Sequence, residues 1–449
     1  MENIKPWQKL EELLETNQLD EIKDYLTNLS AEEVASAINH LKHVDQSEVV
    51  SSMTPVDAAE MMDDLPDVLR GQLLDGLSSE NAAAIINEFS SDDQADVINN
   101  MEDDAADAIL EEMHPSMAEN VRQLIQYGPD TAGGLMITEY LAFDQGKTVG
   151  EVADRLRSKS DEFKKFNIQY IYVTTKNRFT GVLRTRDLLL SNVETLLSEI
   201  VIANALTVED TTPLDELIRF FDKYDFYGVP VLHEGSLVGV VLRKNILEAE
   251  TEKANLELLE TQGIVGGEEL RTMPLLLRSR RRLSWLSVNI LLNIVAASVI
   301  AFYQDTLSSV IALAVFLPVI SDMSGCSGNQ AVAVSLRELS LGVLKPYEVM
   351  RVWWQEVSLG LINGLVLGTL IGLAAYLWKG NIYFGLVAGG ALAINTVVAV
   401  SIGGTIPLIL KRFNADPALA SGPILTTITD MFGFFLALTF AGLFMSKLV

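Results

Sequence analysis

The 449-residue sequence contains one cysteine, Cys326, and four histidines. A single cysteine excludes an intramolecular disulfide and a cysteine-rich zinc site, and the scattered histidines show no metal-ligand spacing. Basic residues are also few, since 33 Lys and Arg stand against 60 Asp and Glu. This deficit argues against nucleic acid as a partner, because phosphate backbones are held by clustered Lys and Arg.

Charge is distributed unevenly along the chain. Residues 278–449 carry 11 Lys or Arg and 7 Asp or Glu, which leaves 22 basic and 53 acidic residues before them. The first 277 residues are therefore strongly acidic, a composition that favours solubility and attracts cations. A chain of this length exceeds what one hydrophobic core usually organises, so several domains are expected.

Charge is nearly absent from long segments of the second half. About 20 apolar residues are enough to cross a hydrocarbon core roughly 30 Å thick. Backbone amides in lipid need internal partners, so such segments should be helices. The expected spans are Ser284–Tyr303, Thr306–Leu336, Val357–Trp378, Gly380–Leu410 and about Gly422–Ser446. The sequence therefore predicts a five-helix α transmembrane domain in contact with membrane lipid.

Basic residues mark one side of these spans. They are Arg278, Arg280, Arg281 and Arg282 before the first span, Arg337, Lys345 and Arg351 between the second and third, and Lys411 and Arg412 between the fourth and fifth. Positively charged loops stay in the cytoplasm. The sequence therefore predicts a multi-pass protein of the cytoplasmic (cell) membrane with its N-terminus inside and its C-terminus outside.

Residues 7 to about 126 show apolar positions at helical spacing, interrupted by Ser, Thr, Asp and Pro. Segments such as SAEEVASAINHL and SSENAAAIINEF begin with a capping residue and recur roughly every dozen residues. This pattern predicts an all-α superhelical domain. The pattern does not indicate a function, and a docking or spacer role accounts for such a repeat.

From Leu135 the pattern changes to strand, turn, strand and helix, and GVPVLHEGSLVGVVLRKNIL repeats that order. The two α/β units resemble a tandem pair of CBS modules, which bind adenosine nucleotides or metal ions. Of the nucleotide motif of such modules, only Asp187 stands as a ribose-binding carboxylate. ATP and a nucleotide-free pair both stay open. Glu248–Gly263 is a charged helix that joins this pair to the membrane, either as a coupling element or as a solvated linker.

Polar groups inside the spans need an explanation, because a carboxylate at the centre of a membrane helix costs about 2.5–3.5 kcal/mol. Asp430 lies about two turns into the expected last span, and it either faces a watery path or is protonated against a neighbouring helix. Pro318–Gln330 contains glycines, serines and an amide that are expected to break the second span. Its exposed oxygens would suit magnesium or calcium; the alternative is that the glycines serve packing. Asp416 and Glu356 stand near span ends.

The order of these parts, with SGNQ in the second span and DPALASGP followed by TTITD in the fifth, resembles the MgtE family of magnesium channels. The resemblance implies a homodimer whose pore is lined by the second and fifth spans. It implies a passive conduit for Mg²⁺. The sequence shows no nucleophile-and-base arrangement and no ATP-hydrolysing motif, so we expect no enzyme. Asp430, Asn329 and Gly325 then match pore positions, and Asp416, Ala415 and Glu356 match a metal site at the cytoplasmic mouth.

The resemblance also implies a head that senses Mg²⁺ and closes the pore. The matching or partnering acidic residues are Asp92, Asp96, Asp215, Asp225 and Glu248. In place of an acidic TVDDV-type turn, however, the chain reads Leu242, Arg243, Lys244, Asn245 and Ile246. We therefore expect weakened or altered magnesium gating. In the pore segments Cys326 and Gly422 depart from the family pattern, and Asp322 is an additional carboxylate.

The expected domains are a helical domain at 1–128, a CBS pair at 129–247, a connecting, plug-like helix at 248–277 and a pore domain at 278–449. The leading hypothesis is a Mg²⁺-selective channel or transporter for which Mg²⁺ is both cargo and regulator. One alternative is a divalent cation exchanger or exporter coupled to Na⁺ or H⁺. Another is a membrane-anchored CBS sensor, although an anchor has no use for polar groups at depth.

Overall fold

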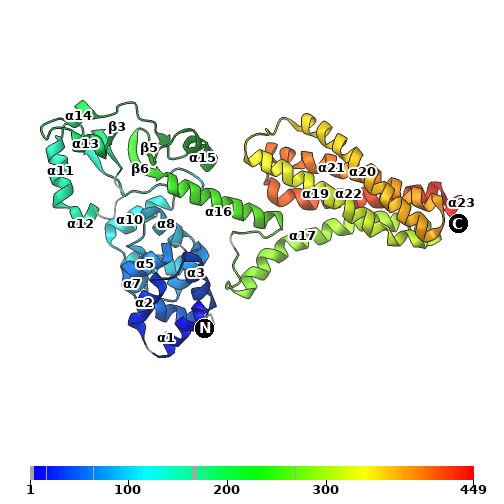
Figure 1. Ribbon diagram of the computed structural model, residues 1–449, viewed down its shortest axis with the longest axis horizontal. Coiled ribbons are helices and arrows are strands. Elements are labelled where there is room, and N and C mark those ends of the chain that lie inside the picture. The colour runs from blue at the N-terminus through cyan, green and yellow to red at the C-terminus, as the bar shows by residue number, and fades with distance from the viewer. Residues whose placement is uncertain are drawn as a thin grey trace. The chain divides into compact units, whose positions relative to one another are not determined.

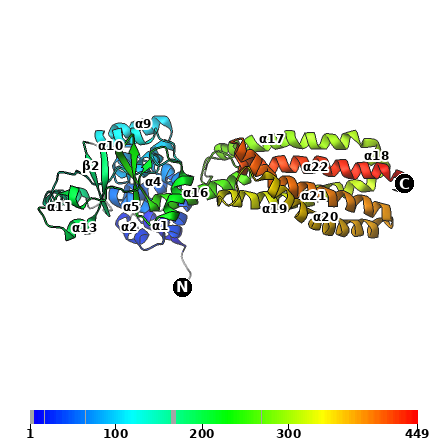
Figure 2. The same cartoon turned by 90° about the horizontal axis from the view of Figure 1, so that it is seen from above.

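The computed structural model describes residues 5–16, 18–63, 65–163, 169–176, 178–267 and 269–448. It divides into two compact units, Met1–Lys253 and Ala254–Val449. The first unit holds the short helices and the sheet, and the second holds the long apolar helices (Figures 1 and 2).

Short amphipathic helices build the first part of the first unit. In the described residues they are α1 (Pro6–Glu15), α2 (Leu19–Thr27), α3 (Ala31–His40), α4 (His43–Ser51), α5 (Pro55–Asp63), α6 (Asp67–Asp75), α7 (Ser79–Ile86), α8 (Ser91–Asn99), α9 (Asp103–Glu112) and α10 (Pro115–Leu124). Capping explains where several begin: the Ser30 and Ser78 side chains accept hydrogen bonds from the backbone N–H groups of Glu33 and Asn81. The predicted helical domain is confirmed.

The second part of this unit is an α/β region. Its elements are β1 (Ala142–Asp144), α11 (Val149–Ser158), α12 (Ser160–Phe163), β2 (Tyr170–Thr175), β3 (Arg178–Arg184), α13 (Thr185–Leu190), α14 (Leu197–Ile200), β4 (Val208–Glu209), α15 (Leu214–Lys223), β5 (Gly228–His233) and β6 (Ser236–Leu242). The strands form a sheet in the order β1-β2-β3-β6-β5-β4.

The sheet consists of two halves with the same construction. In each half a short strand pairs in parallel with the first strand of an antiparallel hairpin, β1 with β2 and β4 with β5. Both hairpins carry a register shift at the equivalent place, between Val173 and Thr174 and between Val231 and Leu232. The halves meet where β3 pairs with β6. This internal repeat confirms the predicted tandem CBS modules.

Helix α16 (Arg243–Thr261) begins directly after β6. The sequence places the charged connecting helix from Glu248, but the structure starts it five residues earlier. The reason is Ile246, which is buried in the core of the second CBS module and fixes the first turn there. Arg243 and Lys244 therefore project from a helical turn and not from a loop before the helix.

Five helices in the described part of the second unit are long and apolar enough to cross a membrane. They are α17 (Leu275–Phe302), the run Ile311–Ser340 made of η1 (Ile311–Val315) and α19 (Leu317–Ser340), α20 (Val349–Lys379), α21 (Ile382–Arg412) and α22 (Pro417–Leu443); α18 (Gln304–Ser309) and α23 (Met445–Leu448) are short. The predicted five-span domain is confirmed.

The expected break in the second span is wrong. Helix α19 runs without interruption through Gly325 and Gly328, and the irregular backbone lies earlier, at η1. The glycines allow close packing instead. A Cβ added at Gly328 would lie 2.9 Å from the carbonyl oxygen of Ala399, and one at Gly403 would lie 2.2 Å from that of Gly328. Close helix contact through small residues is common in membranes, so the packing alternative describes this segment.

Helix α21 is the centre of the membrane unit. Of its most apolar stretch 61% is buried, against 6% for α17. It packs against α19, α20 and α22. The backbones of α20 and α21 approach closely, because Gly368 of α20 faces the carbonyl oxygen of Gly389 and the side chain of Ala393.

We predict that Gly368→Ala destabilises the membrane unit. The added Cβ would lie 2.6 Å from the Gly389 carbonyl oxygen, which cannot move without moving α21. Overpacking of this kind costs about 1–3 kcal/mol. The matched control is Gly442→Ala in α22, where an added Cβ meets nothing within 4 Å. Thermal unfolding in detergent should give a lower midpoint for Gly368→Ala only; equal midpoints for the two variants would contradict the packing.

Candidate functional site

Asp430 is at the middle of α22. The sequence places it about two turns into the last span, but α22 already begins at Pro417, where Asp416 caps the helix and proline stands at the first position. The carboxylate accepts a hydrogen bond from the Ser321 hydroxyl of α19. Asp322 is within electrostatic reach of the same carboxylate. Polar groups from two candidate spans thus meet near the middle of α22.

A row of polar side chains continues from this point along α19. Asp322, Cys326, Asn329 and Gln330 are exposed and recur at spacings of three and four residues, so they share one helix face. We call these four residues the polar stripe. Such a face is costly against lipid, so it requires water or another protein surface.

The predicted pore residues lie around this place in different ways. Gly325 is buried, and a Cβ there would be 3.8 Å from the Thr429 hydroxyl oxygen. It therefore lies next to the residue that precedes Asp430. Asn329 is exposed one turn further along α19, within the polar stripe. Among the described residues no three His, Cys, Asp or Glu side chains gather closely enough to hold a metal ion.

The predicted cytoplasmic-mouth residues do not share one set of neighbours. The Asp416 carboxylate accepts from the backbone N–H of Ala418 at 2.7 Å and that of Leu419 at 3.4 Å, and it faces Glu260 of α16. Burial, with repulsion from Asp416, raises the pKa of Glu260 to about 7. Ala415 directly precedes Asp416.

Glu356 has a different environment. Its side chain packs against Gly404, where an added Cβ would lie 2.5 Å from its Cγ, and Glu338 is its charged neighbour. One carboxylate oxygen, Oε2, is buried and has no hydrogen-bond partner among the described residues. The carboxylate is thus positioned by packing and not by a counter-ion.

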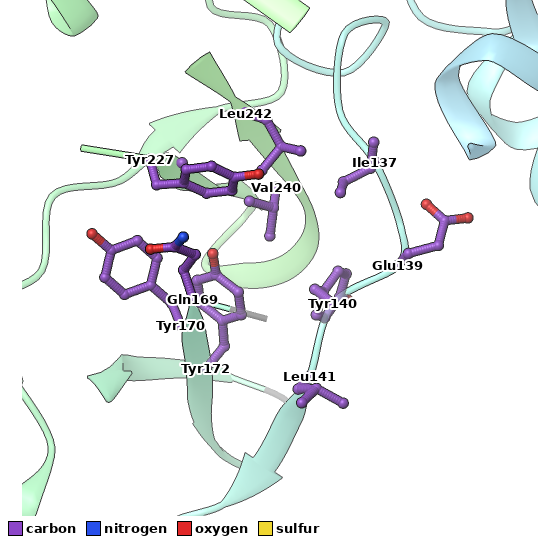
Figure 3. Close-up of a pocket in the computed structure, with 11 residues that line it drawn as sticks. Ile137, Glu139, Tyr140, Leu141, Gln169, Tyr170, Tyr172, Tyr227, Val240 and Leu242 are labelled. Atoms are coloured by element: carbon purple, nitrogen blue, oxygen red, sulfur yellow. The ribbon is translucent and has the colours of Figure 1, made fainter. Parts of the chain in front are cut away.

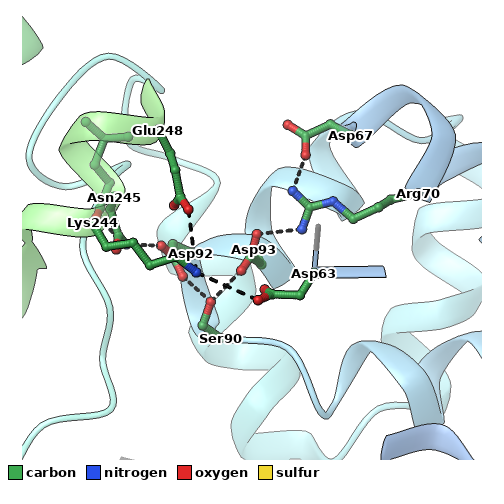
Figure 4. Close-up of polar contacts among 10 residues, drawn as sticks. Asp63, Asp67, Arg70, Ser90, Asp92, Asp93, Lys244, Asn245 and Glu248 are labelled. Carbon is green, nitrogen blue, oxygen red and sulfur yellow. Dashed lines mark hydrogen bonds and ion pairs between the residues drawn. The ribbon is translucent and has the colours of Figure 1, made fainter. Parts of the chain in front are cut away.

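In the first unit, the start of α16 meets the acidic face of α8 (Figure 4). The Asn245 amide donates to the Asp92 carboxylate and, at 3.4 Å, to the Leu135 carbonyl. The Lys244 ammonium lies 3.7 Å from a carboxylate oxygen of Asp63 and 3.5 Å from one of Glu248. A lysine therefore stands between an acidic residue of the helical domain and one of the connecting helix.

Two further regulatory candidates also have cationic partners. Asp215 accepts from Lys253 at 2.6 Å, and the fully exposed Asp225 accepts from Arg243 at 3.3 Å. The positively charged partners all come from α16. The sequence drew attention to the basic pair Arg243 and Lys244, but the carboxylates that they contact could be identified only from the fold.

Asp96 is the regulatory candidate with the most unfavourable surroundings. It lies partly buried on α8 among Asp67, Asp92, Asp93 and Glu252. Burial, reinforced by these like charges, raises the pKa of Asp96 to about 7. Burial and Asp93 raise the pKa of Asp92 to about 7 as well. Arg70 relieves part of the cluster through ion pairs with Asp67 and, at 2.7 Å, with Asp93.

A cleft lies between the two CBS modules (Figure 3). It encloses about 350 Å³, including the part open to solvent, and Tyr140, Tyr170, Tyr172 and Tyr227 contribute to its lining. Tyr140 and Tyr172 meet edge to face with ring centroids 5.9 Å apart. Asp187, on α13, is not among the described lining residues; it contacts Arg186 at 3.5 Å. The structure therefore does not bring the predicted ribose ligand into this cleft.

Two residues of the membrane unit were missed by sequence reasoning. Glu260 was considered only as part of the charged connecting helix, and nothing in the sequence indicates that it faces Asp416. Asn395 is the only side-chain amide in the 31 residues of α21, and this isolation was a usable signal.

Family models match the helical domain, the CBS region and the membrane helices of this chain. The model of the MgtE family, described as a divalent cation transporter, matches residues 317–440. The model of the MgtE intracellular N domain matches residues 57–130, and the CBS domain model matches residues 197–252. The match over the membrane helices places the chain in the class of divalent cation transporters.

Relatives over most of the chain give the family. The magnesium transporter MgtE of Bacillus subtilis is 30% identical over 318 residues, 70% of this chain and 70% of the relative. That of Thermus thermophilus is 33% identical over 336 residues, 73% of each. A solved cytosolic domain of the Mg²⁺ channel MgtE in complex with ATP matches 54% of this chain and 98% of its own, at 30% identity and a TM-score of 0.49. The chain belongs to the MgtE family.

We predict that Asp96→Asn stabilises the protein more at pH 8 than at pH 5 when magnesium is absent. With a folded pKa of about 7 against roughly 3.9 unfolded, ionisation is penalised only in the folded state, so stability falls as pH rises from about 4 to about 7. Asparagine removes this penalty, which is at most about 4 kcal/mol at pH 8 because one pKa unit corresponds to about 1.36 kcal/mol. Thermal unfolding of the full chain with EDTA tests it. Asp107→Asn, on the exposed face of α9, should shift both midpoints equally; a pH-independent gain for Asp96→Asn would contradict the burial effect.

Proposed function

We propose that this protein conducts Mg²⁺ passively across the cytoplasmic membrane through a pore between two copies of the chain. The observation that carries the proposal is the polar stripe of α19 next to Asp430. Asp430 receives the ion, and the second and fifth spans line its path. A pair of chains covers the two stripes against each other and supplies two such carboxylates.

The chemistry of the site suits a hydrated magnesium ion. Mg²⁺ gives up its waters reluctantly, so a protein can hold it through its first hydration shell with oxygen ligands. Asp430, the hydroxyl of Ser321 and the amide of Asn329 offer oxygens of this kind. The relatives are named magnesium transporters, which agrees with this choice of ion.

The proposed orientation places the soluble unit in the cytoplasm and the end of α22 outside. It rests on the basic residues next to the first, third and fifth spans. Asp416, with Ala415, then lies at the cytoplasmic mouth. Burial, with repulsion from Asp416, raises the pKa of Glu260, and a divalent cation between the two carboxylates would offset both effects. Glu356, with its unpaired oxygen, is a further ligand of the mouth.

We propose that magnesium regulates this pore weakly, because α16 carries its own cations. Lys244 stands between Asp63 and Glu248, Arg243 pairs with Asp225, and Lys253 pairs with Asp215. Each ammonium or guanidinium neutralises a carboxylate that a free ion would otherwise bridge. Asp92 and Asp96 keep the charge density that still attracts a divalent ion at the remaining sensor.

ATP stays a prediction for the CBS pair. The tyrosine-lined cleft supports it, since aromatic rings stack on nucleobases. Asp187 lies outside that lining, so a ribose contact there would need a different residue.

We predict that Asp430→Asn abolishes Mg²⁺ uptake into proteoliposomes under an imposed Mg²⁺ gradient. The substitution keeps the shape and removes the charge that holds the ion. The control is Asp305→Asn, an exposed carboxylate in α18, which should leave uptake unchanged. Wild-type uptake should need no Na⁺ or H⁺ gradient; a requirement for either would favour the exchanger.

The single cysteine reports whether the polar stripe lines the path. A membrane-impermeant, positively charged thiol reagent should block wild-type uptake and leave Cys326→Ser unaffected. If Asp430→Asn takes up Mg²⁺ at the same rate as wild type, the proposed pore is refuted. No uptake above empty vesicles, from protein shown to be folded, would favour the anchored sensor.

We predict that Lys244→Glu makes uptake more dependent on magnesium at the side of the soluble unit. The change removes the tethered cation between Asp63 and Glu248 and leaves like charges that only a free ion can hold together. The ratio of uptake at low to high magnesium should rise about 2- to 5-fold, the range for exposed ion pairs. Lys42→Glu, the same charge change at an exposed position, is the control. An equal ratio in both variants would contradict the proposal.

A further inference from the structure

Asn395 is a completely buried amide in the middle of α21, the central helix of the membrane unit. Its Nδ2 donates to the Ser324 hydroxyl oxygen at 2.5 Å and to the Thr429 carbonyl oxygen at 2.9 Å. One side chain thus joins α19 to α22. Because a carbonyl oxygen can only accept, the bond to Thr429 fixes which end of the amide faces it.

The two partners of Asn395 stand next to the proposed ion site. Thr429 directly precedes Asp430 in α22. Ser324 lies one turn from Ser321, and its hydroxyl proton is shared between the Ile320 carbonyl at 2.8 Å and the Ser321 carbonyl at 3.0 Å. Ser321 in turn donates its hydroxyl to Asp430. Two short routes therefore lead from the amide to the Asp430 carboxylate, one through Ser324 and Ser321 of α19 and one through Thr429 of α22.

The surroundings of Asn395 are adapted to the amide at a cost. A Cβ added at Gly433 of α22 would lie 2.8 Å from Nδ2, so only glycine leaves room for it. Oδ1 has no hydrogen-bond partner among the described residues although the side chain is fully buried. An unsatisfied buried acceptor is expensive, so an apolar residue would serve simple packing better. Within the described part of the chain, the hydroxyl of the neighbouring Thr396, which is also fully buried, bonds only within α21, to the Leu392 carbonyl at 2.8 Å.

We propose that Asn395 is a positioning residue of the ion path. It holds the Ser321–Ser324 turn of α19 and the Thr429–Asp430 step of α22 in fixed register, and this register sets the distance between the Asp430 carboxylate and the other oxygens of the site. Without the amide the two helices keep their apolar contacts but lose the bond that aligns them at this level. The inference rests on the proposed function.

The test is Mg²⁺ uptake by Asn395→Leu in proteoliposomes, with Thr396→Val as the matched control that removes a buried polar group bonded only within its own helix. We measure the Mg²⁺ concentration at half-maximal uptake and the ratio of Mg²⁺ to Ca²⁺ uptake. Asn395→Leu should change both about 3- to 20-fold, the range set by single hydrogen bonds between membrane helices. Thr396→Val should stay within about twofold. A purely structural role would lower only the maximal rate.

A double-mutant cycle tests whether Asn395 acts through Ser324. It needs Ser324→Ala alone and Ser324→Ala combined with Asn395→Leu. If both act through one bond, the double variant is no worse than Asn395→Leu. If Asn395→Leu does not fold, Ser324→Ala decides with the same two readouts. If these variants show the same half-saturating Mg²⁺ concentration and the same ion ratio as wild type, the inference is overturned. The proposed function still holds in that case, provided that wild type takes up Mg²⁺ and Asp430→Asn does not. Absence of that uptake would remove both.

Discussion

A polar group in hydrocarbon must find its partner inside the protein, and the membrane unit is organised by this constraint. Most hydroxyl groups of α21 meet it within their own helix, as Ser401 does with the Val397 carbonyl and Thr405 with that of Ser401. Other groups reach across, as Ser335 does to the Gly404 carbonyl. Glycines make the crossings close enough. The polar contacts between helices therefore fix the register of the helices, and apolar packing provides most of the remaining contact between them.

The elements of the fold were largely predictable because their signals are long or repeated. Uncharged stretches gave the spans, and the two similar α/β segments gave the CBS pair. The start of α22 was placed too late, although Asp416 followed by Pro417 is a helix-start signal. The break expected in α19 failed for a different reason. Glycine destabilises an isolated helix, but between packed membrane helices the same residue is selected for close approach.

The sites were predictable only as residue types. Asp430 could be chosen because a lone carboxylate in a span is expensive. Its partner Ser321, by contrast, follows from the way α19 and α22 pack. In the first unit several ion pairs join residues far apart in the chain, such as Lys244 with Asp63. No local pattern contains that information. Glu356 and Asp416 were expected as one group, and the structure gives them different charged neighbours, Glu338 and Glu260.

The polar stripe also bears on how the protein is made. An unpaired chain would present Asp322, Cys326, Asn329 and Gln330 to acyl chains, and a carboxylate at depth alone costs about 2.5–3.5 kcal/mol. The proposed pairing of two chains would remove this cost and would obey mass action, so the paired fraction would rise with the density of chains in the bilayer. At low expression a larger share of newly inserted chains would then stay unpaired. The face proposed to line the ion path would in that case also be the face that marks an unpaired chain for quality control.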